Sequence, residues 1–139
     1  MARLHSSVVG LRVTGDDLIP DEITKLLGGS PTKSRTKGDK IYTNPQTGRV
    51  TIAKFGNWIL SAADREPEDI NGQIHQILNQ VTDDLEVWQA ITKKYHVDLF
   101  CGLFMRSDND GFTISSQCLA ALGARGIEIS LDIYSGDDE

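Results

Sequence analysis

The stretch Val8-Val9-Gly10-Leu11-Arg12-Val13 decides how the chain begins to fold, because aliphatic residues recur there with the period of a strand. A polar loop connects it to Ile19-Pro20-Asp21-Glu22-Ile23, which has the proline and the acidic first turn of a helix start. Leu27-Gly28 has the glycine that typically ends a helix. The first 28 residues therefore predict a strand, a turn and a short helix.

The same order of elements returns near the other end of the chain. Phe100-Cys101-Gly102-Leu103-Phe104-Met105 reads as a strand, Ile114-Ser115-Ser116-Gln117-Cys118 as a helix start, and Leu122-Gly123 as a helix end. Two strand–helix units of this kind predict a sheet that carries its helices on one face.

Length and composition indicate one folded domain spanning residues 1–139, with a core at about 7–134 and an acidic tail at 135–139. The chain has 39% hydrophobic and 24% charged residues and only 4 prolines, as folded proteins do. No apolar run approaches the roughly 20 residues of a membrane helix, and the start lacks the apolar segment of a secretory signal. We therefore expect a cytoplasmic protein with no membrane partner, in which Cys101 and Cys118 are small buried residues rather than a disulfide.

The charge is distributed unevenly. The net charge is −6, residues 33–40 contribute +3, and the remainder therefore carries −9. An acidic body repels nucleic acid, so we expect no nucleic-acid partner. Lys33, Arg35 and Lys37 could hold an anion, but they lack a phosphate-loop pattern, and a solvated loop is the competing interpretation.

Between the two units, a strand is expected at about 49–61, with a bulge or close approach at Gly56. Residues 30–48 read as a long polar connection with at most a short strand around Ile41-Tyr42. Apolar residues recur at helical spacing from Ile70 to Val81 and again from Leu85 to Tyr95, with a break and a capping signal at Asp83. A last strand alternates over 127–134.

Together these elements predict an α+β fold: a two-layer sandwich with a mainly antiparallel sheet of about five strands and helices on one face. The order approximates a ferredoxin-like unit with an added helix and strand. The strands at 7–14 and 97–106 should lie near the centre of the sheet.

Several segments taken in order resemble one family. They are Leu11-Arg12-Val13-Thr14-Gly15, Ile19-Pro20-Asp21-Glu22-Ile23, Lys37-Gly38-Asp39, Asn57-Trp58-Ile59-Leu60-Ser61-Ala62 and Leu131-Asp132-Ile133-Tyr134. Over about residues 8–134 the chain resembles the uncharacterised, mainly bacterial family known as domain of unknown function 4279. This resemblance implies an α+β domain and brings no established activity.

The sequence contains no assembled catalytic, cofactor or metal signature. His5, His75 and His96 lack metal-ligand spacing, and Asp108-Asn109-Asp110-Gly111 lacks the ligand spacing of a calcium loop. Cys118 has no charged neighbour in sequence that would activate its thiol. We therefore assign no catalytic residue, no cofactor and no metal.

A binding surface is the stronger candidate. Strand alternation places one mixed polar and aromatic set on the sheet face opposite the helices: Arg12, Phe100, Phe104, Ser130, Asp132 and Tyr134. Such a composition is typical of a recognition surface, although a structural pair between Arg12 and Asp132 would explain it as well. Trp58 is either a core residue or a further binding residue.

Three functions remain open. The first is a protein-binding module, either a homodimer or an inhibitor of another protein in the manner of an immunity protein. The second is a small-molecule or anion-binding domain that uses the basic loop 33–40. The third, an enzyme, would need a cleft with a perturbed carboxylate or thiol.

Overall fold

Five strands form the main sheet, in the order β3, β6, β2, β7, β9. The computed structural model describes residues 2–44 and 46–135. β2 (Ser6–Gly15) pairs antiparallel with β6 (Gly56–Ser61) on one side and with β7 (His96–Phe104) on the other. β3 (Lys33–Arg35) is antiparallel to β6, whereas β9 (Glu128–Tyr134) is parallel to β7. The sheet is therefore mixed, with β2 at its centre and β7 beside it, as predicted for these two strands.

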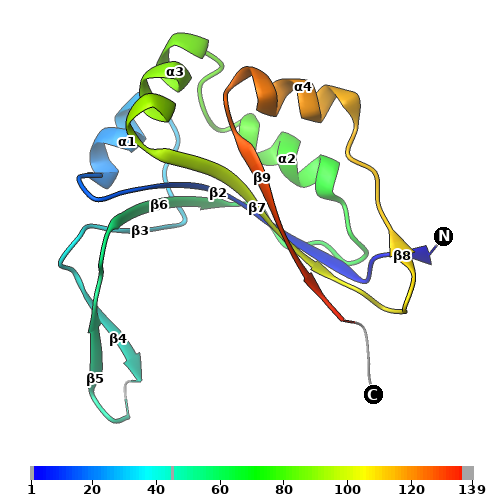
Figure 1. Ribbon diagram of the computed structural model, residues 1–139, viewed down its shortest axis with the longest axis horizontal. Coiled ribbons are helices and arrows are strands. Elements are labelled where there is room, and N and C mark those ends of the chain that lie inside the picture. Colours follow the sequence, from blue (N-terminus) through cyan, green and yellow to red (C-terminus); the bar gives the residue numbers. More distant parts are fainter. Residues whose placement is uncertain (1, 45, 136–139) are drawn as a thin grey trace.

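Four helices cover one face of this sheet (Figure 1). They are α1 (Pro20–Leu27), α2 (Ile70–Leu78), α3 (Leu85–Lys94) and α4 (Ser116–Ala124). The α+β class and the break in the middle helical region are confirmed, but a ferredoxin-like topology is not. Asp84, rather than the predicted Asp83, caps α3 by accepting a hydrogen bond from the Glu86 backbone N–H.

The core lies between the sheet and the helices. Alternate residues of β2 and β7 point towards the helices and are buried, as are both tryptophans: Val9, Leu11, Val13, Leu99, Cys101, Leu103, Trp58 and Trp88. Both cysteines are buried and free, as the sequence indicated. In the described part of the chain, no helix is long and apolar enough to cross a membrane.

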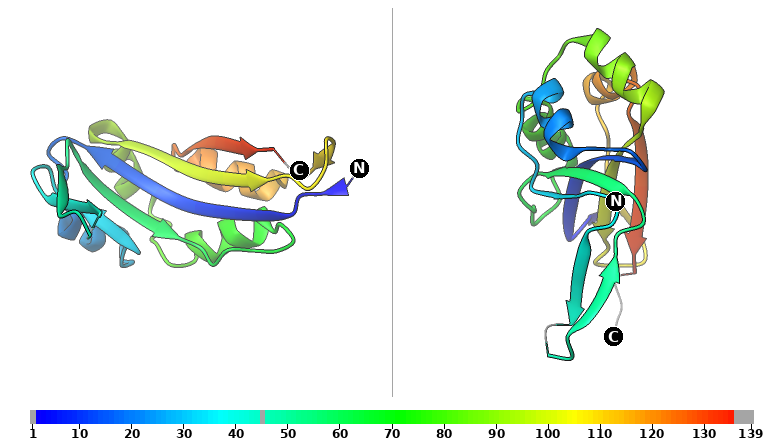
Figure 2. Two further views of the ribbon diagram at one scale, coloured as in Figure 1. Left: turned by 90° about the horizontal axis from the view of Figure 1, so that it is seen from below. Right: turned by 90° about the vertical axis from the view of Figure 1, so that its left-hand side faces the viewer.

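A second, two-stranded unit stands away from this body. β4 (Lys40–Asn44) and β5 (Arg49–Ile52) form an antiparallel hairpin that projects on the side opposite the helices (Figures 1 and 2). The short strand expected around Ile41-Tyr42 is confirmed as β4, but the polar connection predicted over the rest of residues 30–48 is interrupted by β3, which was not predicted. β3 has three residues and is largely exposed, so it lacks the apolar alternation by which a strand is recognised.

The strand predicted over 49–61 is divided into β5 and β6 by a bend that ends at Gly56. A Cβ atom at Gly56 would lie 2.7 Å from the backbone oxygen of Leu18, so the close approach expected at this glycine is confirmed. A minor parallel pair joins β1 (Ala2–Arg3) to β8 (Asp110–Gly111). Most of the predicted acidic tail, residues 136–139, lies outside the described residues.

Trp58→Ala should lower the free energy of unfolding by about 3 to 5 kcal/mol, because it empties a fully buried site beneath α1. Leu119→Ala is the matched control, since Leu119 of α4 is 50% exposed and should change stability by less than about 1 kcal/mol. Denaturant midpoints measure both changes. Equal small effects would contradict the position of Trp58 in the core.

Candidate functional site

The sheet face opposite the helices, here called the open face, carries the side chains that the sequence proposed for binding. In β2 and β7 the even-numbered residues face away from the helices, and the strand registers extend that alternation to β9. The structure thus brings together five of the predicted residues on this face: Arg12, Phe100, Phe104, Asp132 and Tyr134. Figure 2 (left) views the sheet from this side, with the helices behind it.

The centre of the open face is an ion pair between adjacent strands. Arg12 Nε donates to Asp98 Oδ1 at 2.8 Å and Nη2 donates to Oδ2 at 2.5 Å, while the Ser130 hydroxyl donates to Oδ2 at 2.7 Å. The alternative pair with Asp132 is wrong, because the register sets Arg12 opposite Asp98 and sets Asp132 opposite Gly102.

Asp98 is only 3% exposed, so its charge depends on these partners. Burial by itself raises the pKa of the Asp98 carboxyl, but the hydrogen bonds from Arg12 and Ser130 and the charge of Arg12 lower it further, and the net pKa lies below its ordinary value. The hydrogen bond to Asp98 correspondingly raises the pKa of Arg12 against the opposing effect of burial. The pair therefore remains charged across the neutral range.

Aromatic rings surround this pair on the β7 and β9 side. The Arg12 guanidinium lies 4.9 Å from the centroid of the Phe100 ring, and Phe104 stacks on Tyr134 with centroids 4.8 Å apart. The Tyr134 hydroxyl donates to Asp132 Oδ2 at 3.2 Å, and this hydrogen bond raises the pKa of Tyr134. The open face thus carries two groups, the ion pair with Phe100 and the stacked rings of Phe104 and Tyr134.

Trp58 does not belong to this surface. It points to the helix face, is 0% exposed and donates from Nε1 to the Thr24 hydroxyl at 3.0 Å. The interpretation of Trp58 as a core residue is confirmed, and no partner can reach it.

The three predicted anion-binding residues are only partly brought together. Lys33 and Arg35 project from β3 on the open face, whereas Lys37 lies beyond the strand with its Nζ 3.6 Å from an Asp16 carboxylate oxygen. Arg35 also lines a 220 Å³ hollow with Phe55 and Asn57, in the corner between the sheet and the hairpin.

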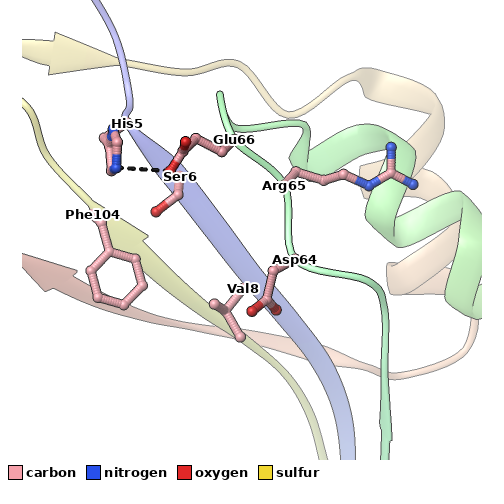
Figure 3. A pocket seen from close by; sticks show the side chains of 7 residues that line it. All are labelled: His5, Ser6, Val8, Asp64, Arg65, Glu66 and Phe104. Atoms are coloured by element: carbon pink, nitrogen blue, oxygen red, sulfur yellow. Dashed lines mark ion pairs between the residues drawn. The ribbon is translucent and has the colours of Figure 1, made fainter.

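The feature that sequence reasoning missed is a hollow of about 350 Å³ at the opposite end of the open face (Figure 3). We call it the socket. Its floor is formed by Ser6, Val8 and Phe104 of the open face, and its rim by His5 on one side and by the charged residues Asp64, Arg65 and Glu66 on the other. His5 Nε2 lies 3.0 Å from a Glu66 carboxylate oxygen. An apolar floor beneath a charged rim is the form of a pocket that receives an apolar side chain.

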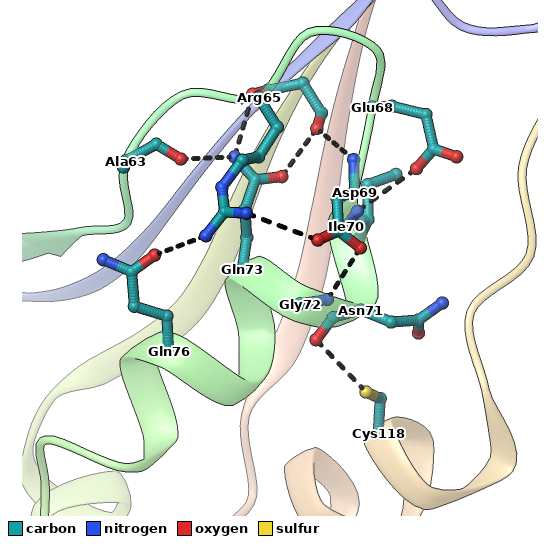
Figure 4. Close-up of polar contacts among 11 residues, drawn as sticks. Ala63, Arg65, Glu68, Asp69, Ile70, Asn71, Gly72, Gln73, Gln76 and Cys118 are labelled. Atoms are coloured by element: carbon teal, nitrogen blue, oxygen red, sulfur yellow. Dashed lines mark hydrogen bonds and ion pairs between the residues drawn. The ribbon is translucent and has the colours of Figure 1, made fainter.

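The loop that forms one wall of the socket is held firmly to β2 and α2 (Figure 4). Ser7 and Arg65 exchange backbone hydrogen bonds at 2.9 and 3.1 Å. The fully buried Gln73 side chain accepts from the Ser7 hydroxyl at 2.6 Å and donates to the Ser7 and Ala63 carbonyls. The amide oxygen and both amide hydrogens of Gln73 are hydrogen-bonded, so the loop is fixed in place and the socket is preformed.

The model of the family described as Domain of unknown function (DUF4279) matches residues 4–136, nearly the whole chain. The chain belongs to the DUF4279 family. No curated protein and no solved structure matches it significantly. The DUF4279 match covers the socket, the ion pair and the hairpin alike.

The enzyme hypothesis has one geometric candidate in this DUF4279 chain. Cys118, in the first turn of α4, lies with its Sγ 3.8 Å from His75 Nε2, a pairing across 43 residues that the sequence could not reveal. The thiol is however 1% exposed, so a substrate has no access to it. Among the residues that the structure describes, no three potential metal ligands form a group.

Both cysteines should resist alkylation in the folded protein at pH 8. Cys118 is buried, and burial together with the charge of Asp98 raises the pKa of Cys101 to about 11. Mass spectrometry after iodoacetamide treatment should show no labelling in buffer and two labels in denaturant. Rapid labelling of Cys118 in the native protein would show that the thiol is accessible and would support the cysteine–histidine pair as an active site.

Asp98→Asn should destabilise the protein by about 3 kcal/mol, because it breaks the ion pair with Arg12. This value is at the low end for a buried ion pair, since the guanidinium of Arg12 still reaches solvent. The pKa of Asp98 is lower in the folded protein than its unfolded value of about 4. The stabilisation that the ionised Asp98 provides is therefore complete above about pH 4 and is lost as the pH falls through the folded pKa. Denaturation at several pH values should therefore show the two proteins converging in stability below about pH 4. A constant difference at all pH values would contradict this assignment.

Proposed function

We propose that this DUF4279 protein is a non-enzymatic protein-binding module and that its open face is the contact surface. The observation that carries the proposal is the socket: an apolar hollow, already formed, beside the stacked rings of Phe104 and Tyr134. The two free cysteines are consistent with action in the cytoplasm.

The energetics of interfaces support this proposal. Binding energy concentrates where a large side chain fills a preformed pocket, and a polar rim then excludes water. Here Val8 and Phe104 supply the apolar floor, and Asp64 and Glu66 supply exposed charges around it. Because the socket wall is held by buried hydrogen bonds, little ordering entropy is lost when a partner binds.

The partner can be a second copy of the chain or a foreign protein. A two-fold axis lets one surface complement itself, so a homodimer is the simplest assembly. The foreign alternative is the inhibition of another protein, as an immunity protein inhibits its toxin. Both would use the same open face.

A second candidate function, binding of a small anion, has one specific observation in its favour. The registers place Lys33 and Arg12 in one row across β3, β6 and β2, with Ile59 between them, and Arg35 lies on the same face. Arg12 is however already bonded to Asp98, and Lys37 lies near Asp16. Titration with phosphate and a small dicarboxylate, followed by thermal shift, would support this candidate only if Arg35→Gln removed the stabilisation.

Phe104→Lys should convert a self-associating wild type into a monomer, because it places a charge on the floor of the socket and removes the ring that stacks on Tyr134. Ile133→Lys is the matched control. It adds the same charge on the adjacent strand, at a residue that is 60% exposed but faces the side of the helices. Sedimentation velocity measures both proteins, and circular dichroism verifies their folding.

If Ile133→Lys dissociates the assembly and Phe104→Lys does not, the contact lies at the free edge of β9 and the open face is the wrong surface. If the wild type is itself monomeric, the test moves to foreign partners, and a partner bound equally well by wild type and Phe104→Lys would refute the open face.

A further inference from the structure

The β4–β5 hairpin, which we call the arm, is unusual in exposing apolar side chains on an isolated pair of strands. Tyr42, Val50 and Ile52 are 66%, 41% and 51% exposed. In the described part of the chain, β4 and β5 pack mainly on each other. A lone two-stranded hairpin is marginally stable in water, and exposed apolar groups of this kind mark surfaces that a partner covers.

The charge of the arm and its surroundings indicates which kind of surface would complement it. Residues 33–54 contain six Lys or Arg and one Asp, a net charge of +5, so the rest of a chain with net charge −6 carries −11. Within the described residues, Lys40, Arg49 and Lys54 form no ion pair. The surface that best complements this basic and apolar arm is therefore acidic with an apolar hollow.

The socket of the same protein meets that description. Its rim carries the exposed carboxylates of Asp64 and Glu66 above the apolar floor of Val8 and Phe104. Two basic side chains also line the rim: His5 lies 3.0 Å from Glu66, and Arg65 is paired with Asp69 at 3.5 Å. Among the described residues, Asp64 is therefore the rim carboxylate that forms no ion pair.

The arm and the socket lie at opposite ends of the open face, since β2 runs from Ser6 at the socket to Gly15, which pairs with Gly56 beside the arm. Nine residue steps of a strand separate these ends by about 30 Å. The arm therefore cannot fill the socket of its own chain.

We propose that the occupant of the socket is the arm of a second copy, in a two-fold dimer with the two open faces opposed. The molecule has the shape of an L, with the sheet and the arm as its limbs (Figure 1). A rotation of 180° brings the arm of each copy to the socket end of the other, so both contacts form at once. This inference rests on the proposed function, because it assigns a partner to the same open face.

A charge exchange tests the dimer. The arm variant is Lys40→Glu with Arg49→Glu, and the socket variant is Asp64→Lys with Glu66→Lys; all four residues are exposed, so both variants should fold. Each variant alone has like charges on its arm and socket, and its dimerisation should weaken at least tenfold. Mixed in equal amounts, the two variants have opposite charges at both contacts and should form a heterodimer with at least tenfold tighter association than either alone. Native mass spectrometry distinguishes the heterodimer from either homodimer.

The matched control is Lys93→Glu with Lys94→Glu, which makes the same change in charge on exposed residues of α3, far from the open face. It should leave the dimer unchanged. If it weakens the dimer as much as the arm variant does, the effect reflects net charge and the arm is not the occupant.

The remaining outcomes separate this inference from the proposed function. If Phe104→Lys dissociates the dimer while the arm and socket variants remain dimeric, the open face binds but the arm is not its occupant. If the charge variants respond as expected and Phe104→Lys has no effect, the arm contacts the charged rim at Asp64 and Glu66 but does not fill the apolar floor, and the socket is not the pocket that the proposed function requires. A wild type that is monomeric at about 0.5 mM, where even weak association is visible, overturns the second copy as partner.

Discussion

The alternation of side chains along β2 and β7 is the constraint on which the other features depend. Val9, Leu11, Leu99 and Cys101 must all point towards the helices. A shift of one residue would bring Arg12 of β2 or Asp98 of β7 into the core. The need to bury these apolar residues therefore also fixes which residues lie on the other face. The helices cover one side only, so whatever the even-numbered residues carry is presented outward.

The ion pair between Arg12 and Asp98 follows from this constraint. Its contribution to net stability is small, because a buried ion pair can be replaced by apolar residues with little loss of folding free energy. Its main role is to fix the register between the two central strands. A slip by two residues would keep the alternation of both faces but would separate the guanidinium from its carboxylate. The pair also divides the open face. The socket lies on one side of it and the corner with Arg35 and Phe55 lies on the other.

The elements predictable from sequence are those in which one periodic signal is long and its ends are marked. β2, β7, α1 and α4 meet that condition, and β3 does not, because it is short and largely exposed. The arm was predicted only in part, because its strands are short and their apolar residues are exposed. The residues of the open face could be assigned from alternation alone. Their partners could not, because Arg12 meets Asp98 only through a register between residues 86 positions apart. The socket was beyond prediction for a similar reason: one wall is a loop whose position depends on the buried amide of Gln73.

The separation of arm and socket along one sheet has a consequence for any assembly that the arm makes. A contact between two different surfaces of a chain generates either a closed ring or an open filament, depending on the rotation that relates the copies. A filament would leave an unpaired basic arm at one end and an unfilled acidic socket at the other. With the two open faces opposed, as proposed, each copy would contribute both surfaces to the same interface. The basic arm of each copy would then face the carboxylates of Asp64 and Glu66 on the other copy, which is the charge match that the proposed dimer requires.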